Sequence, residues 1–523
     1  MNKFIVKTVQ IVFSFFLVIM MLALSVSIGQ RIADGFIGNL ITIGLIVFSV
    51  LAICFGGKLL QVARTKLIKP VERLTVKQMA WIIGLFSLVT KVLFTFLFNV
   101  DSTLHSDMQM YHSFANQIAQ TGEITEYVTY ATKHEYTAIY GMILSPFAKI
   151  FGSDPKVLTI SLSVCISFAF VLLFDIIRKK VGKNTAFCGI MLYNVMPIGL
   201  FQTQLLVHET ALLIFGIAAL WMFLKAFEQK LHIAWRIVCL ALAGIFVTIG
   251  LKINTGGLIM LVSFCIISVV KIVGKKVTIK KLLHVGCVFL IVGLTFVLMS
   301  NILSSSVDNL INTADGSAYR NDKKVPYGWP IYLGMNYETS GVINKEDADT
   351  YQSYTAIEDP EEAKQYQINL IKDRANEYVQ NPGRIPVHLF NKMKILWGEV
   401  WLPFAYEQGN EVEQFVLKGA GGILYKGMYL LNAIVNLVVM AMILFAFKPK
   451  GTEVDCENDP ELHFKMVIIG VTTILLVYEI SSKYTSYLQI FMYAIWMLRL
   501  KDFVCNSNSI QNKVAGLFKK HTL

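Results

Sequence analysis

A short segment after residue 100 holds the side chains best suited to acid–base chemistry. Asp107, Tyr111, Phe114 and Ile118 recur at the spacing of one helical face, and Gly122 is a natural stop for that helix. A carboxylate that stays ionised at a membrane surface can take a proton from the hydroxyl group of an acceptor. The segment therefore indicates a general base at Asp107, with Tyr111 one turn away as a substrate contact.

The start of this helix bears on the charge of Asp107. Ser106 and Gln109 fit a capping box, which places Asp107 in the first turn. The amino end of a helix favours a negative charge, so we expect this carboxylate to be ionised. The alternative is an ordinary acidic first-turn residue on an amphipathic helix, and the spacing alone does not exclude it.

Three further turns carry charge where predicted membrane spans end. Glu209 follows His208 in a tight turn and precedes an apolar run, which puts it at the mouth of the membrane. A solvated turn acid and a turn histidine are the simpler alternatives. Lys252, in the glycine-containing turn 250–257, could hold a phosphate through its ammonium group and exposed backbone N–H groups. The alternative is a lysine that only extends to the interface.

The third turn contains Glu479, Lys483 and Tyr484. These residues can form a pair within one helix, or they can line the same outer site as Asp107. Together the turns put carboxylates and lysines on one membrane surface, where burying an ionisable group is costly and usually functional. Such a surface suits a charged substrate that is anchored in lipid.

The composition supplies membrane helices to position these turns. Hydrophobic residues make up 55% of the 523 residues, and charged residues only 16%. Runs of roughly 20 apolar residues recur along the chain, and each is long enough to cross a bilayer. We therefore predict an all-α polytopic membrane protein with about 12 spans. They lie near residues 8–30, 36–56, 79–99, 155–177, 184–203, 205–226, 235–252, 254–273, 282–303, 420–446, 464–481 and 485–500.

Two long segments between the spans are predicted to lie on the outer face, at 101–154 and 304–419. In the first, the stretch 136–152 is apolar but short and contains Pro146. We interpret it as interfacial or re-entrant rather than as a further span. The chain accordingly divides into two N-terminal helices with a basic loop, a core with the first outer loop, a large outer loop, and C-terminal helices with a tail: 1–78, 79–303, 304–419 and 420–523.

The large outer loop has helical patterns of its own. Residues 360–380 look helical and are followed by the stop signal 381–383. Residues 385–404 are amphipathic and contain Trp397 and Trp401, as expected of a helix that lies in the membrane interface. Both outer loops are thus expected to contain juxtamembrane helices.

The net charge of +12 is concentrated in short loops beside helix ends. This is the pattern of cytoplasmic loops, whose partner is the anionic bilayer surface, and it argues against a nucleic-acid partner. With an even number of spans, both termini would be cytoplasmic in the plasma membrane. The basic residues are Lys58, Arg64, Lys66, Lys69, Arg73, Lys77, Arg178, Lys179, Lys180, Lys183, Lys271, Lys275, Lys276, Lys280 and Lys281.

The motifs, in their order and placement, resemble those of the GT-C membrane glycosyltransferases. The similar branch is that of the protein O-mannosyltransferases and lipid A aminoarabinose transferases, and the resemblance runs from about residue 79 to 500. Lys483 stands where the family has an arginine, so one ammonium replaces a forked guanidinium. The matching residues are Asp107, Tyr111, Gly122, Tyr136 to Gly152 with Pro146, Pro197, Glu209, Gly250 to Gly256 around Lys252, Gly334, Asn336, Gly341, Asn381, Pro382, Gly383, Lys392, Trp397, Glu479, Lys483 and Tyr484.

The resemblance implies a reaction. The donor would be a sugar on a polyprenyl phosphate, and the acceptor an extracytoplasmic polymer, lipid or protein. Asp107 would deprotonate the acceptor and give inversion, Glu209 would orient the acceptor or the base, and Lys252 would hold the departing phosphate, assisted by Lys483. His208, Tyr111, Glu479 and Tyr484 would contact the substrates. There is no Asp-x-Asp pair at Asp107, so no metal is demanded, and a divalent cation is left open as a cofactor.

The rival hypothesis is a transporter or flippase of lipid-linked saccharides that performs no chemistry. In that case the outer charges would only contact the headgroup, and further charges would lie in mid-span. Lys91 is essentially the one such residue in the sequence. The folded mass on one face and the scarcity of mid-span charge favour the glycosyltransferase, ahead of the transporter and of a scaffold protein.

Overall fold

The computed structural model of the chain is helical wherever it is described. Its described residues form helices and connecting turns, with no β-strand among them. The described ranges are 2–33, 35–63, 69–97, 107–204, 206–228, 230–273, 278–311, 328–357, 359–398, 419–447, 460–481 and 483–521. Ser106 and Trp401, which enter the expectations above, lie outside these ranges.

Nine helices in the described ranges are long and apolar enough to cross a membrane. Each coincides with a predicted span, which confirms an all-α polytopic membrane protein. The helices are α1 (Asn2–Ile32), α2 (Gly35–Ala63), α4 (Val76–Leu97), α8 (Pro155–Val181), α11 (His208–Ala226), α12 (Ile233–Ile253), α14 (Ile279–Leu310), α20 (Gly419–Ala446) and α21 (Pro460–Val477).

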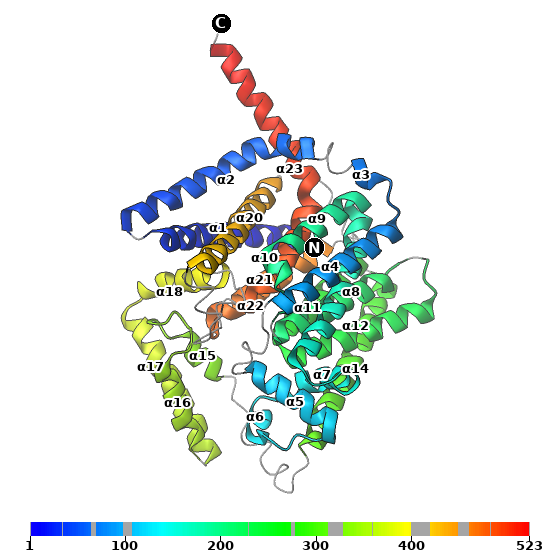
Figure 1. Cartoon of the computed structure of the whole chain (residues 1–523), viewed down its shortest axis with the longest axis vertical. Coiled ribbons are helices and arrows are strands. Elements are labelled where there is room, and N and C mark those ends of the chain that lie inside the picture. The colour runs from blue at the N-terminus through cyan, green and yellow to red at the C-terminus, as the bar shows by residue number, and fades with distance from the viewer. Residues whose placement is uncertain are drawn as a thin grey trace.

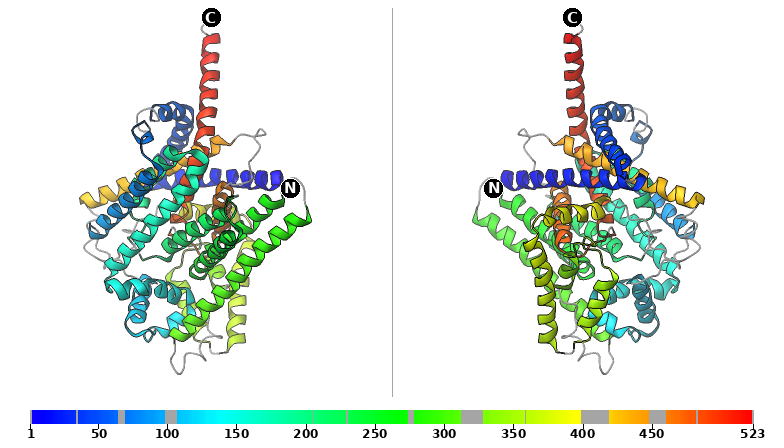
Figure 2. Two further views of the ribbon diagram at one scale, coloured as in Figure 1. Left: turned by 90° about the vertical axis from the view of Figure 1, so that its right-hand side faces the viewer. Right: turned by 90° about the vertical axis from the view of Figure 1, so that its left-hand side faces the viewer.

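The other three predicted spans do not coincide with a described helix that is long and apolar enough to cross a membrane. The count of about 12 spans therefore stays a prediction. α13 (Gly256–Val273) is apolar but short. The predicted span 485–500 falls on the short helix α22 (Lys483–Ser486) and the start of α23 (Gln489–His521). α23 continues as a helix through the predicted tail, and its end projects away from the body (Figures 1 and 2).

The predicted span 184–203 was wrong as a continuous helix. α9 (Lys183–Val195) ends at Met196, whose φ of −71° and ψ of 146° are extended. The next residue, Pro197, disfavours a helical conformation in the residue before it and has no N–H to donate. A short helix, α10 (Pro197–Leu200), follows, and then a non-helical stretch leads into α11.

This interruption, described at residues 196–204, 206 and 207, is packed inside the protein, where its polar groups need internal partners. Thr210 donates its hydroxyl to the carbonyl oxygen of Gln202 at 2.8 Å. The side-chain amide of Gln204 donates to the carbonyl oxygen of Lys91 at 3.1 Å. These hydrogen bonds fix the conformation of the interruption. They thereby also fix the position of the amino end of α11, which follows it.

Lys91 is the fully buried mid-span cation of α4. Its ammonium group donates to the Ser87 hydroxyl at 3.1 Å and to the side-chain oxygen of Asn194 at 3.0 Å. Asn194 stands in the last turn of α9, where a helix presents unpaired carbonyls and favours a positive charge. Lys91 thus stabilises the end of the interrupted helix.

The segment predicted as the first outer loop forms a small helical unit at one end of the molecule. It comprises α5 (Asp107–Thr121), α6 (Val128–Lys133) and α7 (Glu135–Phe151), and α5 packs along α7. The short helix α3 (Lys69–Glu72) and the C-terminus lie at the opposite end (Figure 1). α5 begins and ends as predicted, and Gly122 takes a φ of +80° just beyond it.

α7 covers the predicted interfacial or re-entrant stretch, and Pro146 does not interrupt it. A proline cannot bond the carbonyl four residues earlier, here that of Met142. The hydroxyl of Ser145 donates to this carbonyl at 2.9 Å instead. α7 is not among the helices long and apolar enough to span a membrane.

The segment predicted as the second outer loop contains α15 (Gly328–Gly334), α16 (Lys345–Thr355), α17 (Pro360–Gln380) and α18 (Arg384–Met393), followed by a π-helical turn, Lys394–Gly398. α17 confirms the predicted helix at 360–380. We call residues 328–398 the outer segment. It docks on the turn after α21, because the Glu479 N–H donates to the Pro330 carbonyl at 2.7 Å and the Ile480 N–H donates to the Gly341 carbonyl at 3.0 Å.

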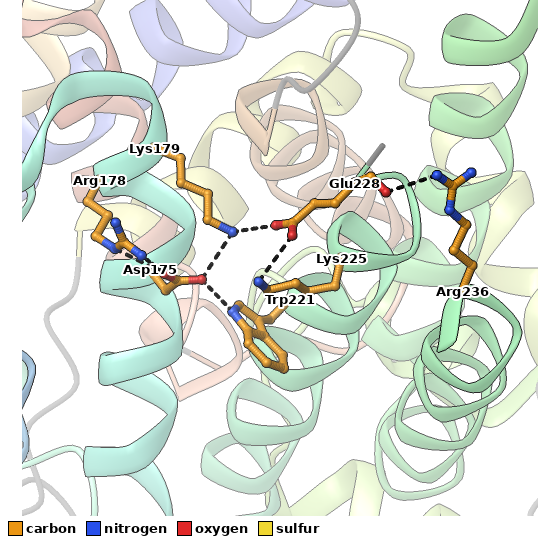
Figure 3. A network of polar contacts seen from close by, with 7 residues as sticks. All are labelled: Asp175, Arg178, Lys179, Trp221, Lys225, Glu228 and Arg236. Carbon is orange, nitrogen blue, oxygen red and sulfur yellow. Dashed lines mark hydrogen bonds and ion pairs between the residues drawn. The ribbon is translucent and has the colours of Figure 1, made fainter. Parts of the chain in front are cut away.

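A network of ion pairs fastens α8 to α11 and to the turn before α12 (Figure 3). Asp175 pairs with Lys179 at 3.2 Å and accepts from the Trp221 indole at 2.8 Å. Glu228 pairs with Lys179 at 2.7 Å and with Lys225 at 3.2 Å. We call this group the Asp175–Glu228 network. Its remaining members are Arg178 and Arg236.

Candidate active site

Asp107 lies at the amino end of α5 among tyrosine hydroxyls from the next two helices. Tyr130 on α6 donates a short hydrogen bond to Oδ1. Tyr136 on α7 donates to Oδ2 at 3.2 Å. Both carboxylate oxygens thus have a donor, one from α6 and one from α7, which packs along α5.

The surroundings keep Asp107 ionised. Burial by itself would raise the pKa of Asp107, but the positive charge of Lys483 and the hydrogen bond from Tyr130 more than offset it. His208 and His134 add smaller effects of the same sign, and the net pKa of Asp107 is lowered. A buried carboxylate that stays charged at neutral pH can act as a base toward a hydroxyl placed beside it.

His208 and Glu209 begin α11, at the end of the interrupted stretch. The Tyr111 hydroxyl lies 2.7 Å from His208 Nδ1, and Glu209 Oε2 lies 3.6 Å from the same nitrogen. Glu209 is 1% exposed, and neither of its oxygens has a hydrogen-bond partner in the described part of the chain. A buried carboxylate without donors is costly, so Glu209 is a candidate for contact with a ligand or a water.

Two further phenols surround Glu209. Tyr140 of α7 and Tyr487, between α22 and α23, are both buried. Burial first, and then the charge of Glu209, raises the pKa of Tyr140 far above its usual range. The Tyr140 phenol therefore stays protonated, and it donates to the carbonyl oxygen of Val207 at 3.3 Å.

The turn after α21 brings its predicted residues toward Asp107. Burial, followed by the negative charge of Asp107, raises the pKa of Glu479, while Lys483 acts in the opposite direction. The Tyr484 hydroxyl donates to Glu479 at 3.5 Å, and the Lys483 ammonium lies 5.4 Å from the Tyr484 ring centroid. Glu479, Lys483 and Tyr484 therefore line the region of Asp107 and do not form an isolated pair.

Lys252 has a different partner. Its ammonium donates to the Ser304 hydroxyl at 2.8 Å and lies 3.7 Å from Glu135, which accepts from the same hydroxyl at 2.7 Å. Glu135 stands at the start of α7, next to Tyr136. Lys483, rather than Lys252, is the cation with the largest effect on the pKa of Asp107.

The sequence interpretation missed several residues of this region. Tyr130, His134 and Tyr136 form a run of ring contacts beside Asp107, with centroids 4.5 Å and 5.8 Å apart along the run. The aromatic-rich stretch 127–140 was visible in the sequence, but no local spacing linked it to α5.

Lys392 of α18, one of the residues that carry the resemblance, makes contacts that the sequence did not predict. Its buried ammonium donates to the carbonyls of Gly334 at 3.0 Å and Tyr478 at 2.6 Å, and so fixes the turn that carries Glu479. Burial lowers the pKa of Lys392 to about 7.

The described residues contain no group of three or more histidine, cysteine, aspartate or glutamate side chains that could hold a metal ion. Asp107 is instead held by tyrosine donors and faced by Lys483. The chemistry that the described side chains can supply is proton abstraction by a carboxylate, with donors and a cation for an anionic group.

Comparison with protein families finds one matching model. Residues 138–299 are similar to the family of dolichyl-phosphate-mannose-protein mannosyltransferases. The matched stretch is less than half of the chain. It includes His208, Glu209 and Lys252, whereas Asp107 and the 479–484 turn lie outside it. The match confirms the resemblance to the GT-C glycosyltransferases.

No curated protein matches the chain. Among solved structures, the chain is similar to the archaeal oligosaccharyltransferase AglB from Archaeoglobus fulgidus, in complex with an inhibitory peptide and a dolichol-phosphate. The identity is 13% and the TM-score 0.42, over 85% of this chain and 51% of the archaeal one. The chain thus spans about half the length of that relative.

Proposed function

We propose that this protein is a membrane glycosyltransferase. It moves a sugar from a polyprenyl-phosphate donor to a hydroxyl group of an acceptor on the outer face of the membrane. The observation that carries the proposal is the ionised, tyrosine-bound Asp107 facing Lys483. The similarity of residues 138–299 to mannosyltransferases that use a lipid phosphate donor supports the same class of reaction.

Asp107 is the general base of the proposed reaction. It takes the proton from the acceptor hydroxyl while the acceptor oxygen bonds to the anomeric carbon of the sugar. The bond from that carbon to the phosphate oxygen breaks, and its electron pair stays on the phosphate. Because the acceptor attacks the face opposite the phosphate, the configuration at the anomeric carbon is inverted.

Lys483 balances the charge that develops on the departing phosphate. A cation already in place at this position stabilises the transition state more than the ground state. Lys252 is the second candidate for this role, although Glu135 at 3.7 Å offsets its charge. Glu209, whose oxygens have no donors among the described residues, is positioned to orient a hydroxyl group of a substrate.

The outer segment is proposed to select the acceptor. It docks beside Glu479 through two backbone hydrogen bonds and through Lys392. It also approaches the base, because the phenol of Tyr351 on α16 acts on the pKa of Tyr130, whose own hydroxyl holds Asp107. An acceptor that reaches Asp107 would therefore pass residues of this segment.

The test uses the purified full-length chain in lipid nanodiscs with labelled polyprenyl-phosphate sugars and a panel of acceptors. The expected result is sugar transfer together with release of polyprenyl phosphate, and loss of both in Asp107→Asn. His284→Gln is the matched control, because this exposed histidine of α14 lies far along the chain from the site. Full activity of Asp107→Asn would disprove the role of the base.

The rival hypothesis, a flippase of lipid-linked saccharides, makes the opposite prediction. Wild-type protein would move the labelled lipid between leaflets and release no polyprenyl phosphate. The described mid-span cation, Lys91, gives this rival little support, because it is occupied at the end of α9 by hydrogen bonds to Ser87 and Asn194.

A further inference from the structure

We propose that His208 donates a hydrogen bond from Nε2 to an anionic oxygen of the departing lipid phosphate. Tyr111 is the positioning residue that fixes the tautomer of His208 for this purpose. The inference rests on the proposed glycosyl transfer and assigns the phosphate a second ligand besides Lys483.

The tautomer follows from the hydroxyl of Tyr111. Tyr111 is 1% exposed, so its O–H needs an acceptor inside the protein. The acceptor that the described residues provide is His208 Nδ1, at 2.7 Å. Burial, the largest cause, raises the pKa of Tyr111 well above its usual range, so the phenol keeps its proton to donate. Neutral His208 therefore accepts at Nδ1 and carries its own proton on Nε2.

The ring of His208 is held firmly in this state. Its centroid lies 5.7 Å from that of Tyr111 and 5.4 Å from that of Tyr136. Glu209 Oε2 lies 3.6 Å from Nδ1, so it places a negative charge beside the ring but forms no hydrogen bond with it. This charge favours any shift of positive charge onto the imidazole when Nε2 donates to an anion.

The Nε2–H donor has no acceptor in the part of the chain that the structure describes, and the nitrogen itself is not fully buried. A ligand can therefore reach this donor, and an acceptor on the ligand would complete it. The neighbouring charges indicate which ligand. The helix α11, which begins with His208, contacts α22, which begins with Lys483. The His208 ring also lies 5.4 Å from the ring of Tyr136, which donates to Asp107, so the donor lies close to both the cation and the base.

An anionic phosphate oxygen fits this position better than the acceptor does. The acceptor hydroxyl must give its proton to Asp107, and a second donor would compete with that transfer. The phosphate gains negative charge as its bond to the sugar breaks, so a fixed N–H aimed at it becomes more favourable in the transition state. In the balanced step, the acceptor proton ends on Asp107, the electron pair of the broken bond ends on the phosphate, and His208 keeps its proton.

The experiment measures binding of the product, polyprenyl phosphate, separately from turnover. His208→Ala removes the donor, whereas the amide nitrogen of His208→Gln can replace Nε2. We expect His208→Ala to weaken binding of polyprenyl phosphate about tenfold and to lower kcat about 100-fold. His208→Gln should keep both within several-fold of wild type, and His284→Gln should match wild type.

Tyr111→Phe tests the positioning role. Without the phenol, His208 can place its proton on either nitrogen, so only part of the protein presents the Nε2–H donor. We expect a drop in kcat of several-fold, with binding of polyprenyl phosphate weakened to the same extent. Unchanged kcat and binding in Tyr111→Phe would overturn this role.

The outcomes separate this inference from the proposed function. If wild type releases no polyprenyl phosphate with any donor and acceptor, the glycosyltransferase itself is disproved. If wild type is active and His208→Ala binds polyprenyl phosphate as tightly as wild type, the phosphate contact is disproved while the function stands. A thermal unfolding curve for His208→Ala that matches His208→Gln shows that the comparison concerns the donor and not the fold.

Discussion

The region around Asp107 and the Asp175–Glu228 network both gather carboxylates at helix ends, but they treat them differently. In the network, each carboxylate lies within salt-bridge distance of two cations, and the side chains are about one-fifth to two-fifths exposed. Around Asp107, the donors are tyrosines, and Glu209 has no hydrogen-bond donor among the described residues. Figure 3 shows how completely the network side chains point toward one another.

This difference in pairing distinguishes charged residues that hold helices together from charged residues that are available to a substrate. Paired, half-exposed ions have already found their partners, and each pair contributes roughly 0–1 kcal/mol to stability. Buried acids whose donors are neutral keep a net negative charge, and this charge remains available to interact with a substrate.

Asp107→Asn should have the largest effect. The amide keeps the size of the side chain but cannot take a proton from the acceptor, so the transfer rate should fall by about 1,000-fold. Initial rates of labelled-sugar transfer measure this loss, with thermal unfolding as the check on folding. A variant within tenfold of wild type would remove the main distinction between the two regions.

Lys483→Met should come second, with a loss of about 100-fold in kcat, because it removes the cation that faces Asp107 and the proposed phosphate. Lys252→Met is the matched comparison. Its ammonium is already paired with Glu135 at 3.7 Å, so we expect a smaller loss. If Lys252→Met is the more damaging change, the phosphate lies at Lys252, and the assignment of the two lysines is reversed.

Tyr130→Phe should change the pH dependence of the reaction. The hydrogen bond from Tyr130 helps to lower the pKa of Asp107, so its removal should raise that pKa. The base is active when ionised, and the acidic limb of kcat/KM should therefore move to higher pH. The measurement is a pH–rate profile from pH 4 to 8, with Tyr127→Phe as a control on an exposed phenol. A profile that does not move would contradict the electrostatic role of Tyr130.

Lys392 extends the comparison to a buried cation whose hydrogen-bond acceptors are carbonyls. Burial lowers its pKa to about 7, against about 10.4 in an unfolded chain. Between these values the unfolded chain holds a proton that the folded chain does not, so the free energy of unfolding should rise with pH in that window. The difference in Tm between wild type and Lys392→Met, measured from pH 7 to 10, should grow in favour of wild type.

Much of this architecture is local in origin and was predictable. The helix that begins at Asp107 follows from apolar spacing and a glycine stop, and α17 follows from its cap and the Asn-Pro-Gly sequence after it. The interruption after α9 also had a local signal, Pro197, but its surroundings were apolar enough to be interpreted as a continuous span. Hydropathy measures burial and does not distinguish a spanning helix from a buried turn.

The partners of the site residues could not be predicted, because they depend on tertiary packing. Tyr130 reaches Asp107 only because α7 packs along α5 and α6 packs against α7. The pairing of Lys252 with Glu135 joins residues more than 100 positions apart. Single-sequence patterns identify which residue types can do chemistry, whereas the charges that tune them come from other elements.

Asp175→Asn should have the smallest effect and provides the sharpest check on the comparison. It removes the ion pairs with Arg178 and Lys179, but Lys179 keeps its partner Glu228, and the Trp221 indole can still donate to the amide oxygen. We expect the free energy of unfolding to fall by about 1 kcal/mol or less, and transfer activity to stay within twofold of wild type. Thermal unfolding and initial rates measure the two quantities. A large loss of activity with an intact fold would mean that the Asp175–Glu228 network takes part in function, and that pairing does not separate structural from functional charges in this protein.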